Sequence, residues 1–469
     1  MIAHRVALTA LVTLALGTQV HAAPKGPEGI WLGTLDAGKV KLRVAFHVAK
    51  KPDGSFSATF DSLDQGAKGL PVEKASYVAP TLRLEMTRVG AIFEGKLDGD
   101  KLSGTFTQGQ PMPLALARVE KIEGPKRPQE PKRPYPYKEE EVAIQVAETP
   151  LAATRATKAI TLGGTLTIPT GKGPFPAVVF ITGSGPEDRD ETVFDHKPFL
   201  ILADALTRRG IATLRLDDRG VGKSGGGTSG DTTFVFAKDV EAELEWLAQR
   251  PEIDKRAIGV IGHSEGGVIG PIAATTSPRA RFVVMLAGTG MTGEQILYAQ
   301  TALMMRAGGA PEGAIRQERV DNEKLYKAMN AAKTDAELDA AVQAYIDADP
   351  KQKTQRQGAK KTLSSPWLRT FLTLDPLPYL EKLKVPVLSI AGDKDMQVPK
   401  ENSPLIEAAL KRGKNPDATV KLLPGLNHLF QHCKTGAPGE YHAIEETFSP
   451  EAVQLVGDWI TERAVKLRK

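Results

Sequence analysis

The sequence predicts an α/β fold: a mostly parallel sheet with helices on both faces and a helical insertion, preceded by a small all-β domain. Three observations predict it. Strand-like and helix-like stretches alternate from residue 141 to 469, and residues 293–370 contain helix-like stretches without strands. Residues 24–120 instead alternate apolar and polar residues between turns. The first pattern is typical of parallel sheets with covering helices, and the last of antiparallel sheets.

The composition is typical of a soluble globular protein. Of the 469 residues, 41% are hydrophobic and 25% are charged, and a chain of this length is expected to form two or three domains. The net charge of +5 is small and is not gathered into one basic stripe, so we expect no nucleic-acid partner. The only cysteine, Cys433, excludes an internal disulfide.

Residues 1–22 have the pattern of a cleavable export signal. Arg5 supplies a positive start, residues 6–16 form a short apolar stretch, and cleavage is expected after Ala22 or Ala23. The apolar stretch has about half of the ~20 residues that a membrane span requires. We therefore expect a signal peptide and no stable membrane insertion after cleavage, which makes the mature protein periplasmic or secreted.

Residues 24–120 predict a small antiparallel β-domain. About seven strand-like stretches, including residues 30–35, 40–48 and 91–97, are separated by turn signals such as Pro-Asp-Gly at residues 52–54. So many short strands in so few residues form a barrel or a sandwich. No catalytic combination of residues occurs there. We expect a domain that packs on the catalytic one, with binding of a ligand or of cell-envelope material as the alternative.

Residues 121–140 are predicted to form a proline-rich linker. The tetrapeptide Pro-Lys-Arg-Pro occurs at residues 125–128 and again at residues 131–134. Such a composition favours extended polyproline and prevents a helix. We expect a semi-rigid spacer, with a recognition motif as the alternative.

Residues 141–469 supply the alternating elements of the α/β domain. The first two strands, at residues 142–146 and 159–168, are expected to be antiparallel. The remaining strands are predicted at residues 177–181, 211–216, 257–261, 282–286, 385–390 and 419–423. The helices are predicted at residues 199–208 and 233–249, directly after residues 262–266, and at residues 450–466, with three cap helices at residues 295–307, 314–332 and 336–348.

The pentapeptide Gly-His-Ser-Glu-Gly at residues 262–266 lies between a predicted strand and a predicted helix. A serine on such a sharp turn projects its hydroxyl at the edge of the sheet, and the next amide can bind a developing oxyanion. Ser264 is therefore the predicted nucleophile, and the amide of Glu265 is one predicted oxyanion donor. The same spacing surrounds Ser224, but more glycines follow it and predict a loop.

The acid and the base are predicted just beyond two late strands, where α/β sheets place their sites. Asp395 follows residues 385–390 and precedes Val398, while His428 follows residues 419–423. A serine needs a base to take its proton and a carboxylate to orient that base. Asp393 competes with Asp395 for the acid role, but its position favours support of the loop.

The loop after residues 177–181 is expected to supply the second oxyanion donor. Its glycines allow backbone amides to turn inward; the amide of Ser184 is the first candidate and that of Gly183 the second, with an ordinary glycine turn as the alternative.

Two motifs that could indicate a cofactor are rejected, so we expect neither a bound metal nor a bound nucleotide. His428 and His432 lack matching carboxylate ligands, and no helix begins at the glycines of residues 220–225.

These segments together resemble α/β-hydrolases. The closest resemblance is to EstD-type carboxylesterases, which are similar to serine aminopeptidase-like hydrolases and can also have a β-domain before the hydrolase. The resemblance starts at about residue 141 and rests on residues 182–190, 217–224, 262–266, 392–399 and 425–430. It implies a triad of Ser264, Asp395 and His428. One departure is Thr182, where many α/β-hydrolases have His before Gly.

We therefore expect a serine hydrolase that cleaves carboxylic esters of short acyl chains. The alternatives are an aminopeptidase-like peptidase or a thioesterase on the same triad and, more remotely, a non-catalytic binding protein. An aminopeptidase needs carboxylates that hold the substrate's ammonium group. Four acidic residues follow the glycine loop: Glu187, Asp188, Asp190 and Glu191. We expect Arg189 and Arg219 to pair with these acids and to brace the loops.

Overall fold

The computed structural model describes residues 26–36, 41–147, 159–227, 230–349 and 353–468. The predicted signal peptide, residues 1–22, lies outside the described residues. The chain divides into two compact units, Met1–Gly124 and Pro125–Lys469. Among the helices in the described ranges, none is both long and apolar enough to cross a membrane.

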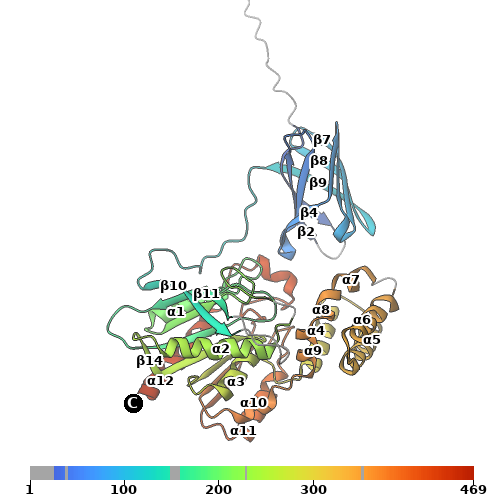
Figure 1. Ribbon diagram of the computed structural model, residues 1–469. Helices are drawn as coiled ribbons and strands as arrows, with labels where there is room; N and C mark the ends of the chain where they lie inside the picture. Colours follow the sequence, from blue (N-terminus) through green and yellow to red (C-terminus); the bar gives the residue numbers. More distant parts are fainter. Residues whose placement is uncertain (1–25, 37–40, 148–158, 228–229, 350–352, 469) are drawn as a thin grey trace, which may run out of the picture. The chain divides into compact units, whose positions relative to one another are not determined.

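The first unit is one antiparallel sheet of nine strands in the order β4-β3-β2-β1-β9-β8-β7-β6-β5. The strands are β1 (Gly29–Asp36), β2 (Lys41–Lys50), β3 (Phe56–Ser62), β4 (Ala67–Val72), β5 (Lys74–Val78), β6 (Thr81–Met86), β7 (Ala91–Asp98), β8 (Lys101–Gln108) and β9 (Gln110–Val119). Because the outer strand β5 lies beside β3, the sheet curls into a near-barrel (Figure 1). Of the two predicted forms, the barrel-like one is confirmed.

Aromatic side chains fill the inside of this sheet. The ring of Phe46 lies 5.0 Å from that of Phe60 and 5.3 Å from that of Phe93, and Phe60 stacks on Phe106. All four are buried. Two strands more than expected are present, because β4 and β5 each have at most one buried residue and so show little apolar alternation in the sequence.

The second unit contains an eight-stranded sheet in the order β10-β11-β13-β12-β14-β15-β16-β17. The strands are β10 (Lys138–Ala147), β11 (Ala159–Ile168), β12 (Phe175–Ile181), β13 (Ala212–Leu216), β14 (Ile253–His263), β15 (Val283–Leu286), β16 (Val387–Gly392) and β17 (Ala418–Leu423). Strands β10, β11 and β13 pair antiparallel, and the pairs from β13 to β17 are parallel. The predicted mostly parallel sheet and its antiparallel opening are confirmed.

Helices cover both faces of this sheet, as predicted. Helices α2 (Thr233–Ala248), α3 (Gly266–Thr276), α10 (Leu377–Lys382) and α11 (Asn402–Arg412) pack on one face, whereas α1 (Pro198–Arg208) and α12 (Pro450–Arg468) pack on the other. Successive residues of β12 point to opposite faces of the sheet. Val179 packs in the core under α2, α3, α10 and α11, and Val178 packs in the core under α1 and α12. Burial on both faces explains why the central strands are apolar throughout.

A cap of helices is inserted between β15 and α10 (Figure 1). It consists of α4 (Gly293–Ala307), α5 (Glu312–Ala331), α6 (Asp335–Ala348), α7 (Lys353–Gly358), α8 (Lys360–Leu363) and α9 (Pro366–Thr373). Capping boxes at Thr292 and Thr334 begin α4 and α6. The cap has its own core, in which Met329, Val342 and Ile346 are fully buried. The helical insertion is therefore confirmed, and α7 to α9 extend it.

Candidate active site

Ser264 lies on a sharp turn between β14 and α3. Its φ angle is +53°, a region that residues other than glycine rarely occupy because it costs about 1–3 kcal/mol. The flanking glycines allow the turn to close: a Cβ atom at Gly262 would lie 1.9 Å from the carbonyl oxygen of Gly266. At Gly266, a Cβ atom would lie 2.3 Å from the carbonyl oxygen of Ile181. The packing thus holds Ser264 in a strained conformation.

A cavity of about 510 Å³ opens over this turn. Ser264 and His428 both line it, together with the loop that follows β12. The cap forms its apolar side through Ile296, Leu297, Met304 and Phe371. Its volume lies within the ~300–1,000 Å³ of small-molecule sites, so the serine hydroxyl and the imidazole face a space that can hold a small substrate.

His428 is held by Asp395. The Nδ1 atom of His428 lies 2.8 Å from Oδ2 of Asp395, and both side chains are buried. The other carboxylate oxygen accepts the amides of Gln397 and Val398, each at 2.8 Å. Because a carboxylate only accepts hydrogen bonds, Nδ1 carries the proton. The Nε2 atom is then the nitrogen that can accept one.

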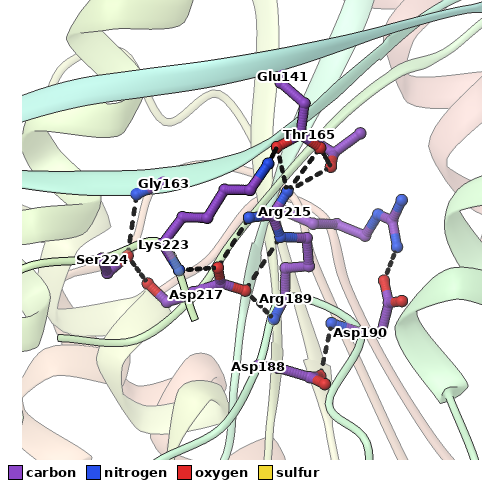
Figure 2. Close-up of polar contacts among 10 residues, drawn as sticks. All are labelled: Glu141, Gly163, Thr165, Asp188, Arg189, Asp190, Arg215, Asp217, Lys223 and Ser224. Atoms are coloured by element: carbon purple, nitrogen blue, oxygen red, sulfur yellow. Dashed lines mark hydrogen bonds and ion pairs between the residues drawn. The ribbon is translucent and has the colours of Figure 1, made fainter. Parts of the chain in front are cut away.

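The competing residues have other partners. Asp393 accepts the amide of Gly425 at 2.7 Å and so holds the loop before His428. The hydroxyl of Ser224 donates to the carbonyl of Asp217 at 2.6 Å and accepts the amide of Gly163 at 2.9 Å (Figure 2). Both residues therefore brace loops; the sequence pattern indicated this role for Asp393 and a loop position for Ser224.

The two predicted donors in the glycine loop differ. Gly183 and Ser184 both line the cavity, but the amide of Gly183 donates to Oε1 of Glu191 at 2.8 Å. An amide whose hydrogen is already held by a carboxylate is not available to an oxyanion. The prediction of Gly183 as a donor is thus corrected, and Ser184 stays the candidate beside Glu265.

A buried ion pair behind the site was not expected from the sequence. The Nδ1 atom of His263 lies 2.8 Å from Oε1 of Glu191, and its Nε2 atom lies 2.9 Å from the carbonyl oxygen of His428. Both ring nitrogens face acceptors, so the ring must be protonated to satisfy both. Burial alone would lower the pKa of His263, but the Glu191 carboxylate outweighs it and raises the pKa to about 9.

This pair predicts a pH dependence of stability. A raised pKa stabilises the folded protein fully below pH 6.5, and that stabilisation is lost as the pH rises through about 9. We expect the unfolding free energy of the wild type, relative to a His263→Gln/Glu191→Gln double variant, to fall by about 3 kcal/mol between pH 6 and 10. Denaturant titrations at several pH values measure it. A constant difference over that range would show that His263 is not protonated.

Ion pairs brace the acidic loop, residues 187–191, and one of the two arginines that the sequence suggested takes part in them (Figure 2). Arg189 pairs with Asp217 at 2.7 Å and Glu141 at 2.9 Å, and Arg219 pairs with residues of another segment, Asp231 and Asp239. In the acidic loop, Asp190 pairs with Arg215. Asp188 instead accepts two backbone amides, those of Asp190 and Thr192, each at 3.0 Å. Arg189 therefore braces the loop through acids outside it, whereas Arg219 pairs in another segment.

Two further carboxyl groups line the cavity together with Ser264. Burial, with Glu191 and Asp218 nearby, raises the pKa of Glu187 to about 7, and this side chain lines the cavity. Glu265 is buried and accepts Thr233 Oγ1 at 2.6 Å and Trp367 Nε1 of α9 at 2.9 Å. The residue after Ser264 thus fastens the cap to the turn.

No metal ligand set is found within the described ranges: no three or more His, Cys, Asp or Glu side chains gather in a way that could hold a metal ion. His432 was considered above as a metal ligand. Its Nδ1 atom instead lies 2.9 Å from Oε1 of Glu446, and its Nε2 atom lies 3.1 Å from Oε1 of Glu451.

A strained serine beneath a cap and a histidine held by a carboxylate after late strands define an α/β-hydrolase. The sequence profile of the Hydrolase_4 family, described as serine aminopeptidase, S33, matches residues 197–432, about half of the chain. The chain belongs to this family, which confirms the resemblance to α/β-hydrolases.

The proteins similar to this chain include some that are named esterases. Esterase EstD of Thermotoga maritima is 27% identical over 268 residues, which are 57% of this chain and 58% of that protein. The chain thus matches less than two thirds of this relative. Among solved structures, a Pyrococcus furiosus esterase, Pf2001, has 17% identity and a TM-score of 0.45, covering 73% of this chain and 99% of the other. Est1E from Butyrivibrio proteoclasticus, solved with ferulic acid, has 17% identity and a TM-score of 0.39, covering 66% and 96%.

Proposed function

We propose that this protein is an exported serine carboxylesterase that cleaves short-acyl esters with Ser264, His428 and Asp395. The observation that carries the proposal is the buried hydrogen bond between Asp395 and His428, because His428 and Ser264 line the same cavity. A base oriented in this way is what a serine hydroxyl needs to become a nucleophile.

In the proposed reaction, Ser264 Oγ attacks the ester carbonyl while His428 Nε2 takes its proton. Asp395 holds the ring and stabilises the imidazolium that forms. The amides of Ser184 and Glu265 stabilise the oxyanion of the tetrahedral intermediate. His428 then protonates the leaving alcohol, and an acyl-enzyme remains on Ser264. His428 then deprotonates a water molecule, which attacks this acyl group. The bond between Ser264 Oγ and the acyl carbon breaks, the acid is released, and His428 returns the proton to Ser264 Oγ.

The lining of the cavity supports a small apolar acyl group. The apolar side chains of α4 and α9 offer no ionic partner to the substrate. Esters also have a better leaving group than amides, so a serine site cleaves them with less demanding positioning. An aminopeptidase-like activity is the second candidate because Glu187 lines the same cavity and could hold an ammonium group.

A comparison of matched substrates tests this proposal. We expect kcat/KM for 4-nitrophenyl butyrate to exceed that for alanine 4-nitroanilide by about two orders of magnitude or more. Spectrophotometric assays of the purified protein measure both. Higher kcat/KM for the anilide would overturn the esterase proposal. Glu187→Gln is the control: it should slow the hydrolysis of alanine esters relative to acetyl esters only if this carboxylate binds the ammonium group.

A further inference from the structure

The segment that opens the second unit is docked on the hydrolase fold. Besides the carbonyl group of its neighbour Lys126, the guanidinium group of Arg127 donates to four backbone carbonyl groups: those of Phe194 and Asp195, each at 3.0 Å, His442 at 2.9 Å and Ile444 at 2.7 Å. These acceptors belong to two chain segments, residues 193–196 and 441–444, far apart in the sequence. A residue of the predicted spacer thus joins them.

The first of these segments is strained. Phe194 and Asp195 have φ angles of +51° and +62°, and such backbone persists only where the surroundings hold it. Arg127 donates to the carbonyl group of each of these two residues. The second segment adds direct contacts: His196 Nε2 lies 2.9 Å from the carbonyl oxygen of Tyr441, and the rings of Phe194 and Tyr441 meet edge to face.

Both segments form part of the wall of the active-site cavity. Val193, Phe194 and Tyr441 line it together with Ser264 and His428. The guanidinium group, bound to the carbonyl of Phe194, therefore ties down backbone that belongs to this wall.

Gln129 is a second side chain that anchors the segment containing Arg127. Gln129 donates to the carbonyl of Phe448 at 2.6 Å and accepts the amide of Thr447 at 2.6 Å. The ring of Phe448 stacks on Phe430, two residues after His428. Residues 125–130 thus follow a fixed path on the second unit.

We propose that Arg127 is a positioning residue of the active site: it fixes residues 193–196 and 441–444 as one wall of the substrate cavity. This inference builds on the proposed function. The role requires a planar group with several N–H donors at fixed angles, which lysine lacks. Residues 125–130, which the composition predicted as part of a semi-rigid spacer, are then a working part of the hydrolase unit.

The sequence offers a matched control within the same repeat. Arg133 occupies the equivalent position in the second Pro-Lys-Arg-Pro tetrapeptide. Its side chain is 73% exposed, pairs with Glu139 and stacks on the ring of Tyr135. The same four residues therefore occur once with the arginine inserted among carbonyls and once with it on the surface.

The test compares Arg127→Gln, Arg127→Lys and Arg133→Gln. Hydrogen exchange of residues 193–196 and 441–444 should become about tenfold faster in both Arg127 variants, since each loses several hydrogen bonds. KM for 4-nitrophenyl butyrate should rise about tenfold in both, with kcat within about threefold of wild type. Arg133→Gln should match the wild type in exchange and kinetics.

Three results would overturn the proposal. The first is unchanged exchange of the two segments in the Arg127 variants. The second is kinetics no different from those of Arg133→Gln. The third is a loss of kcat accompanied by faster exchange over the whole fold, which would indicate general destabilisation. If the wild type cleaves no ester, the proposed function fails, while the exchange comparison still decides whether Arg127 holds the wall.

Discussion

Ser264→Ala is expected to lower kcat/KM for esters by at least about three orders of magnitude while leaving the fold unchanged. The hydroxyl is the only group of the protein that bonds to the acyl carbon in the proposed mechanism. Alanine keeps the size of the side chain and the backbone of the turn, so the sheet and α3 should pack as before. Steady-state kinetics and circular dichroism on the same preparation measure both parts.

Ser224→Ala is the matched control because it changes the same residue type in the same local motif. It removes a buried hydroxyl that bonds to Asp217 and Gly163, which should cost about 1–3 kcal/mol of stability. Its activity, however, should stay within a few-fold of the wild type. Equal loss of activity in the two variants would mean that Ser264 does not have the special role proposed here.

Asp395→Asn is expected to lower kcat by about 10⁴-fold, the effect seen when the equivalent carboxylate of a serine protease is replaced. The amides of Gln397 and Val398 would hold the asparagine oxygen, which turns its NH₂ group toward His428 Nδ1. That nitrogen would then have to accept, and the proton would move to Nε2. A ring in this tautomer cannot take the proton of Ser264.

Asp393→Asn should have a small effect on kcat, because its Oδ1 atom only accepts the amide of Gly425 and asparagine also offers an oxygen there. Measuring kcat and KM for both variants distinguishes the two carboxylates. A larger loss of kcat in Asp393→Asn than in Asp395→Asn would assign the acid role to Asp393.

Much of the fold was predictable because its signals are local. The strands of the parallel sheet are buried on both faces, so they appear as short apolar stretches, and the turn at Ser264 needs glycines at fixed spacing. Asp395 and His428 could be proposed because the carboxyl ends of parallel strands meet at one edge of the sheet. Each of these inferences requires only the residues within one strand and the loop that follows it.

The contacts that sequence reasoning missed join residues far apart in the chain. Glu191 and His263 are 72 residues apart, and Arg127 and Ile444 are 317 apart. Local spacing carries no information about such pairs. The engagement of the Gly183 amide depends on one of them, because the oxygen that pairs with His263 also accepts this amide. Strands β4 and β5 were missed for a different reason: their weak burial leaves little period-two pattern.

The positive φ angle of Ser264 places activity and stability in opposition at one residue. Glycine is the residue that fits φ = +53° without strain, yet glycine has no hydroxyl. Selection for a more stable protein would therefore replace the side chain that the proposed reaction needs, and the energy stored in this turn must be offset by packing elsewhere in the fold. Attempts to raise the heat resistance of this hydrolase should thus change the cores and leave the turn untouched.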